Sequence, residues 1–95
     1  MVLTEEAIEI SNKTAMDLGY DTKKMKVKAD TENSVWSSYL ASYDVLKENK
    51  ELASKLQHRD YWAVYFEPTE PMLGGDLFVF VNKKTGGILG VLRGQ

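Results

Sequence analysis

The chain has 95 residues, and 43% of them are apolar, which is enough to build one hydrophobic core but not a second. It contains no cysteine, which excludes disulfides, thiolate nucleophiles and zinc-thiolate sites. The formal net charge is −2 and most lysines are interspersed with acids, so the coherent basic face that nucleic-acid binding requires is not expected. We therefore expect residues 1–95 to form a single domain whose charge suits a basic protein partner.

The amino-terminal segment predicts a protein that stays in the cytoplasm. Glu5 and Glu6 stand where a signal peptide carries Lys or Arg. The longest apolar runs, Leu77 to Val81 and Ile88 to Leu92, are far too short to span a membrane. We expect no membrane partner.

The first predicted elements are a helix and an edge strand. Thr4 can cap a helix from about Glu5 to Leu18, with Gly19 in the position that ends it. The expected apolar face consists of Ala7, Ile8, Ile10, Ala15 and Leu18. The segment Lys24 to Asp30 alternates charged and apolar residues, as a strand at a sheet edge does, and its lysines discourage pairing between chains.

The middle of the chain predicts a helical region. Asn33 and Ser34 can cap a helix that begins near Val35. The spacing of Val35, Trp36, Tyr39, Leu40 and Tyr43 puts these residues on one helical face. Asp44 can cap a continuation and Asn49 another that uses Leu52, Ala53 and Leu56. The pattern fits one bent helix or two or three short ones.

The carboxyl-terminal part predicts three antiparallel strands joined as a meander. Aromatic and β-branched residues make Tyr61 to Glu67 a central strand, followed by strands at Leu77 to Val81 and Ile88 to Arg93. Gly86 can take a positive φ in the last hairpin. We expect an α+β domain in the order α-β-α(α)-β-β-β, with the helices packed on one face of a mainly antiparallel sheet. Something else, such as a partner, is expected to cover part of the opposite face.

Side chains that could carry chemistry do not form a recognisable catalytic set. His58 is the only histidine, and we expect it to be an ordinary loop residue, because no positioned acid and nucleophile accompany it. Glu67, Glu70 and Asp76 could converge at one end of the sheet, but they lack the dense acidic pattern of a calcium loop. We expect no enzyme activity, no metal and no cofactor.

The helical middle region offers a candidate contact surface. We expect Tyr43 to be the most exposed member of the aromatic stripe, although such a stripe is more often core. Asp44, Glu48 and Glu51 share part of a helical surface if the helix is continuous, and they would complement a basic partner or form a solvated face.

The carboxyl-terminal third carries a family resemblance. The run from Tyr61 to Phe66, the segment from Leu73 to Leu89 with its Gly-Gly turn and Lys-Thr-Gly hairpin, and the end Arg93-Gly94-Gln95 resemble the nuclear transport factor 2-like fold immunity proteins of bacterial polymorphic toxin systems. The hairpin Val-Asn-Lys-Lys-Thr-Gly-Gly-Ile-Leu is also similar to PepSY-type domains.

The resemblance implies a curved cystatin-like or nuclear transport factor 2-like sheet and an immunity protein that neutralises a cognate toxin, such as a basic nuclease. A PepSY-like regulatory or inhibitory domain and a small ligand-binding domain are the alternatives. The predicted partner-binding residues are Tyr43, Asp44, Glu48, Glu67, Glu70 and Asp76.

Overall fold

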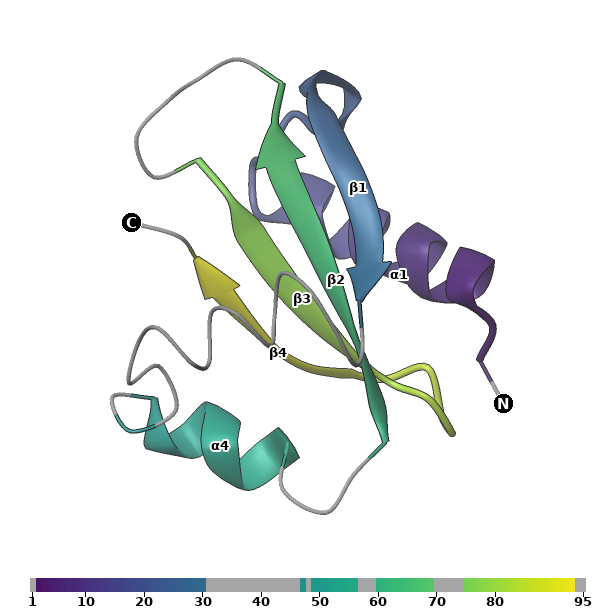
Figure 1. Cartoon of the computed structure of the whole chain (residues 1–95), viewed down its shortest axis with the longest axis vertical. Helices are drawn as coiled ribbons and strands as arrows, with labels where there is room; N and C mark the ends of the chain where they lie inside the picture. The colour runs from purple at the N-terminus through teal and green to yellow at the C-terminus, as the bar shows by residue number, and fades with distance from the viewer. Residues whose placement is uncertain (1, 31–46, 48, 57–59, 70–74, 94–95) are drawn as a thin grey trace.

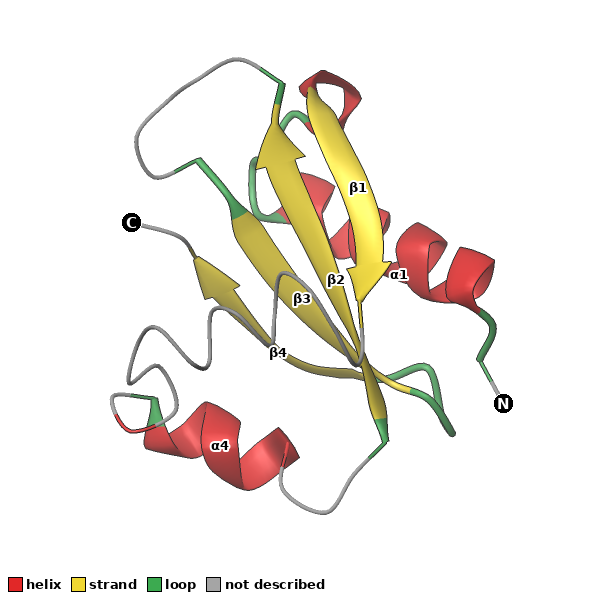
Figure 2. Cartoon of the chain, in the orientation of Figure 1, coloured by secondary structure: helices red, strands yellow, loops and turns green. Residues whose placement is uncertain are grey.

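The computed structural model describes residues 2–30, 47, 49–56, 60–69 and 75–93. The described elements are, in chain order, helix α1 (Thr4–Asp17), a short 3₁₀ helix η1 (Thr22–Lys24), strand β1 (Met25–Asp30), helix α4 (Lys50–Leu56) and strands β2 (Tyr61–Pro68), β3 (Leu77–Asn82) and β4 (Ile88–Arg93) (Figure 1). The four strands form one open antiparallel sheet in the order β1-β2-β3-β4 (Figure 2). The predicted α+β class, the edge strand and the meander are therefore confirmed. The helix expected to begin near Val35, its continuation from Asp44 and the loop position of His58 lie outside the described residues.

Helix α1 begins one residue earlier than predicted. The Leu3 backbone, in an extended conformation, precedes the first turn, and its N–H donates to the Glu6 carboxylate at 3.0 Å. Thr4 is thus the first helical residue, and its expected role as the cap is wrong, because the carboxylate satisfies the free backbone donor from inside the helix. The end of the helix agrees with prediction, since Gly19 takes a φ of +97° and the Tyr20 N–H returns to the Ala15 carbonyl at 3.0 Å.

The sheet is covered on both faces by different helices. One core cluster joins α1 to alternate residues of the strands, including Val64, Phe66, Leu77, Val79 and Val81. The other joins α4 to the residues between them, including Ala63, Phe78, Phe80 and Leu89. Because side chains alternate across a strand, α1 and α4 lie on opposite faces (Figure 1). The expectation that the helices share one face is therefore wrong.

Small residues bring α1 close to the sheet. Ala7, Ser11 and Ala15, spaced by four, are completely buried under the helix. Leu18, predicted to belong to this face, is 38% exposed, because the helix ends there and Tyr20 packs against the core instead.

The last hairpin forms as its turn residues predict. Asn82 Oδ1 accepts hydrogen bonds from the backbone N–H groups of Lys84 and Thr85, and Gly86 has a φ of +77°. Val81 pairs with Ile88 and Phe80 pairs with Gly90, so Leu89 is the extra residue of a bulge that follows this turn on β4. None of the helices that the structure describes is long and apolar enough to cross a membrane.

Candidate functional site

Two of the six predicted partner-binding residues, Glu67 and Asp76, lie among the described residues. Glu67 is exposed near the end of β2, directly opposite Lys26 of β1. Asp76 directly precedes β3, whose Leu77 pairs with Phe66, so Asp76 lies at the same end of the sheet as Glu67. The predicted convergence of acids at one end of the sheet is thus found for this pair. Tyr43, Asp44, Glu48 and Glu70 lie outside the described residues.

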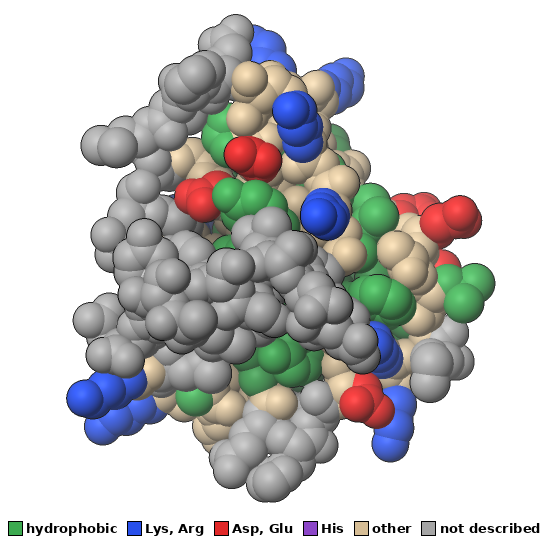
Figure 3. Space-filling view, viewed as in Figure 1, with side chains coloured by type: hydrophobic (Ala, Val, Ile, Leu, Met, Phe, Trp, Pro, Cys, Tyr) green, Lys and Arg blue, Asp and Glu red, His purple; other side chains and the backbone are tan. Residues whose placement is uncertain are grey.

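Lys26, Glu67 and Asp76 form a row across three strands, which we call the charged row. All three belong to the face that carries α4, since their strand neighbours Val27, Phe66 and Leu77 pack in the cluster under α1. Basic and acidic side chains lie together over the ends of β1, β2 and β3 at the top of the space-filling view (Figure 3). The row therefore presents two acids and one base at one end of the sheet.

The Asp76 carboxylate is held in place by a neighbouring hydroxyl. Tyr65 Oη donates to Asp76 Oδ2 at 3.0 Å in a partly buried position. The Tyr65 ring lies against Phe78, with centroids 4.7 Å apart. Because the ring is packed, the hydroxyl has a fixed direction, and the carboxylate that accepts its hydrogen bond is preorganised.

The aromatic side chains next to the charged row continue into the core under α4. Tyr61 and Phe80 meet edge to face with centroids 5.8 Å apart, and Phe78 and Phe80 stack at 6.1 Å. Such ring pairs add stability beyond the area that they bury. The charged row is thus built on a well-packed part of the sheet.

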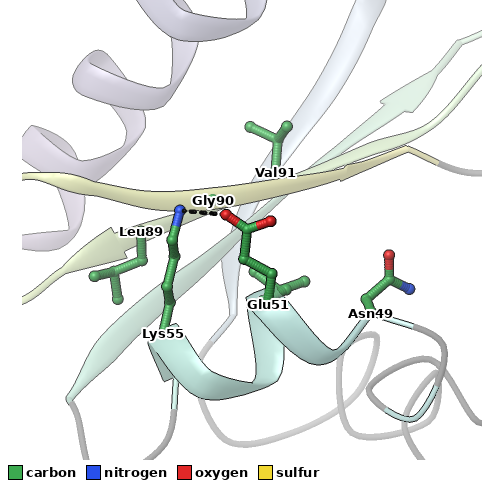
Figure 4. A pocket seen from close by; sticks show the side chains of 7 residues that line it. Asn49, Glu51, Lys55, Leu89, Gly90 and Val91 are labelled. Carbon is green, nitrogen blue, oxygen red and sulfur yellow. Dashed lines mark ion pairs between the residues drawn. The ribbon is translucent and has the colours of Figure 1, made fainter.

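A second candidate site is a hollow of about 270 Å³ between α4 and β4. Its walls are formed by Asn49, Glu51, Leu52, Lys55, Leu89, Gly90 and Val91 (Figure 4). Lys55 Nζ and Glu51 Oε1 form an ion pair 3.6 Å apart across one helical turn at its border. The hollow lies just below the size range of about 300 to 1,000 Å³ that is usual for small-molecule pockets.

The described residues contain no group of three or more His, Asp or Glu side chains that could hold a metal ion. Comparisons of the chain with protein-family profiles, with curated proteins and with solved structures find no match in any of the three.

Sequence reasoning missed Lys26 as a member of the charged row and Tyr65 as the support of Asp76. The alternation of residues 24–30 predicts only that Lys26 protects a sheet edge. Its position opposite Glu67 follows from the pairing of β1 with β2, strands that are separated by 30 residues of sequence, from 31 to 60. Alternation alone could have placed Tyr65 on the same face as Glu67, which was the available signal.

Proposed function

We propose that this chain is an immunity protein that binds a cognate bacterial toxin in the cytoplasm and neutralises it without catalysing a reaction. The motifs that resemble such proteins lie in β2, β3 and β4 and in the hairpin between the last two strands. Under this proposal the sheet is the curved, cystatin-like or nuclear transport factor 2-like sheet of that family, and the protein's role is to occupy a surface that the toxin needs.

The observation that carries the proposal is the charged row. Glu67 is exposed, and the Asp76 carboxylate is oriented by the Tyr65 hydroxyl. A carboxylate that is already oriented, as that of Asp76 is, loses less conformational freedom when it pairs with Lys or Arg of a partner, which favours binding. Such a surface also steers a basic protein toward it, which raises the association rate. A basic toxin such as a nuclease is the partner that this surface fits.

The test is co-expression with the product of the adjacent upstream gene. If the proposal holds, the neighbour alone kills the host, co-expression restores growth and the two proteins purify together. The double variant Glu67→Gln/Asp76→Asn is expected to protect less well than Glu9→Gln/Asp17→Asn, which removes the same charge from exposed positions on α1. A harmless neighbour that does not co-purify would refute the proposal.

The alternative of a PepSY-like inhibitory domain is favoured by one feature, the hairpin from Val81 to Leu89 at the end of a meander that packs on a helix. It predicts a protease or cell-envelope protein as the partner. Co-purification with such a protein, and no protection against the neighbour, would select this alternative.

A further inference from the structure

The two edges of the sheet differ in their protection against pairing with another strand. An edge strand leaves half of its backbone N–H and C=O groups unpaired, and lysines are a common device against unwanted pairing there. The edge strand β1 carries Lys26 and Lys28, both exposed. The opposite edge of the described sheet, β4, has one charged residue, the exposed Arg93 at its end, and none from Ile88 to Leu92. Of the two edges that the structure describes, β4 therefore has the composition that better accepts another strand.

Helix α4 packs close to β4 and widens this edge into a larger surface. A Cβ atom added to Gly90 would lie only 2.7 Å from Leu52 Cδ1, so the absence of a side chain at Gly90 lets the helix approach. The hollow described above lies along this junction and is bordered by Gly90 and Val91 of β4 (Figure 4). Ile88, at the start of the strand, is 41% exposed.

We propose that β4 is the interface between two copies of this chain, paired antiparallel about a twofold axis perpendicular to the sheet. A twofold axis brings the same patch of both copies together, so the patch must complement itself. The strand from Ile88 to Leu92 does so, because antiparallel pairing sets apolar residues against apolar ones and no like charges face each other. The pairing joins the two sheets into one continuous antiparallel sheet.

The charges on α4 support a second copy as the occupant. The twofold axis places the α4 helices of the two copies on the same face of the joined sheet. There they run antiparallel to each other, next to the paired β4 strands. Glu51 and Lys55 lie one turn apart at the border of the hollow. If the axis passes beside the middle of α4, Glu51 of one copy lies opposite Lys55 of the other, which is an attractive pairing.

The helices are also required by the size of the interface. A single pair of six-residue strands buries less than the roughly 1,200 Å² of a standard stable interface. The α4 helices and the hollow between each helix and its strand supply the additional area. We therefore expect a dimer that dissociates on dilution.

The first test follows the purified chain by sedimentation equilibrium and by backbone amide hydrogen exchange at low and high protein concentration. Dimerisation is expected to slow exchange in β4 as the concentration rises and to leave β1, the edge strand with lysines, unchanged. A chain that stays monomeric at all concentrations, or a dimer that protects β4 no more than β1, would overturn the proposal. A strand supplied by a different protein would give the monomeric outcome.

The second test uses charged substitutions of matched exposure. Ile88→Lys places one lysine from each copy at the shared edge and is expected to raise the dimer dissociation constant about tenfold or more, a change of about 1.4 kcal/mol. Leu18→Lys makes the same change in charge at a residue that is 38% exposed at the end of α1, and is expected to leave the constant unchanged. Equal dissociation constants for the two variants would contradict an interface at β4.

Discussion

Replacing Ser11 with alanine is expected to stabilise the protein. Ser11 is completely buried between Ala7 and Ala15 on the face of α1 that packs against the sheet. Its Oγ has no hydrogen-bond partner among the residues that the structure describes. A buried hydroxyl that gives up its hydrogen bonds to water without gaining a partner lowers the free energy of unfolding by about 1 to 3 kcal/mol. The position is flanked on its own face by two alanines, so a third alanine fits the helix–sheet contact.

The expected gain is the sum of three terms. Removing the unpaired hydroxyl recovers about 1 to 3 kcal/mol, and the better helix propensity of alanine adds a few tenths, roughly 0.5 kcal/mol. The small void left by one oxygen atom subtracts roughly 0.5 kcal/mol. The last two terms cancel, so the free energy of unfolding should rise by about 1 to 3 kcal/mol, and each kcal/mol raises the midpoint temperature of a domain of this size by roughly 4 to 8 °C.

Urea unfolding followed by circular dichroism measures this change, provided that the slope with denaturant stays constant. Ser54→Ala is the control, because Ser54 is exposed on α4 and its replacement changes helix propensity without removing a buried hydroxyl. Ser11→Ala should stabilise by about 1 kcal/mol more than this control. A variant that is less stable than the wild type, or that gains no more than Ser54→Ala, would show that the hydroxyl is satisfied in solution and would refute the reasoning.

Three further substitutions test the supports of the sheet by denaturant unfolding. Tyr65→Phe removes the hydroxyl's hydrogen bond to the carboxylate before β3 and should cost about 1 kcal/mol, whereas an unchanged stability would mean that the bond contributes nothing. Gly86→Ala should lower the free energy of unfolding by about 1 to 2 kcal/mol, because alanine is strained at a φ of +77°, and Gly87→Ala, where φ is not positive, should lower it clearly less. Equal losses for the two variants would show that the positive φ is not the cause. Gly90→Ala should destabilise the wild type more than it destabilises the Leu52→Ala variant, because the added Cβ meets Leu52 Cδ1. If the two changes are additive, the close approach of Leu52 is not the reason that position 90 needs glycine.

The elements that sequence reasoning located well are those determined by local patterns. Gly19 and Gly86 stand where the chain needs a positive φ, and both have it. Aromatic and β-branched residues predicted the three strands of the meander to within one residue at each end. Such signals depend on the residues themselves and their near neighbours.

The two faces of the sheet were harder to assign. The continuous apolar run from Leu77 to Val81 is buried throughout, so β3 needs cover on both sides. Composition could show this need, but it could not show that α1 would take one face and α4 the other. That choice depends on packing between segments that are distant in sequence, such as Leu52 against Gly90.

The candidate site was predicted in part for the same reason. The residue types of Glu67 and Asp76 and their positions near strand ends indicated that they could meet at one end of the sheet. Their membership in one row with Lys26 required the register between β1 and β2, which is set by long-range pairing. The buried hydroxyl of Ser11 was missed because serine is common on the exposed side of helices.

The most direct test of the central claim is a calorimetric titration of the purified chain with the purified product of the adjacent upstream gene, either held inactive by a substitution at its own active site or used as a non-toxic fragment. The account predicts a complex that Glu67→Gln/Asp76→Asn weakens about tenfold or more, while Glu9→Gln/Asp17→Asn leaves the affinity nearly unchanged. Equal affinities for the wild type and both double variants would show that the charged row does not bind the toxin, and the absence of any binding would contradict the immunity function itself.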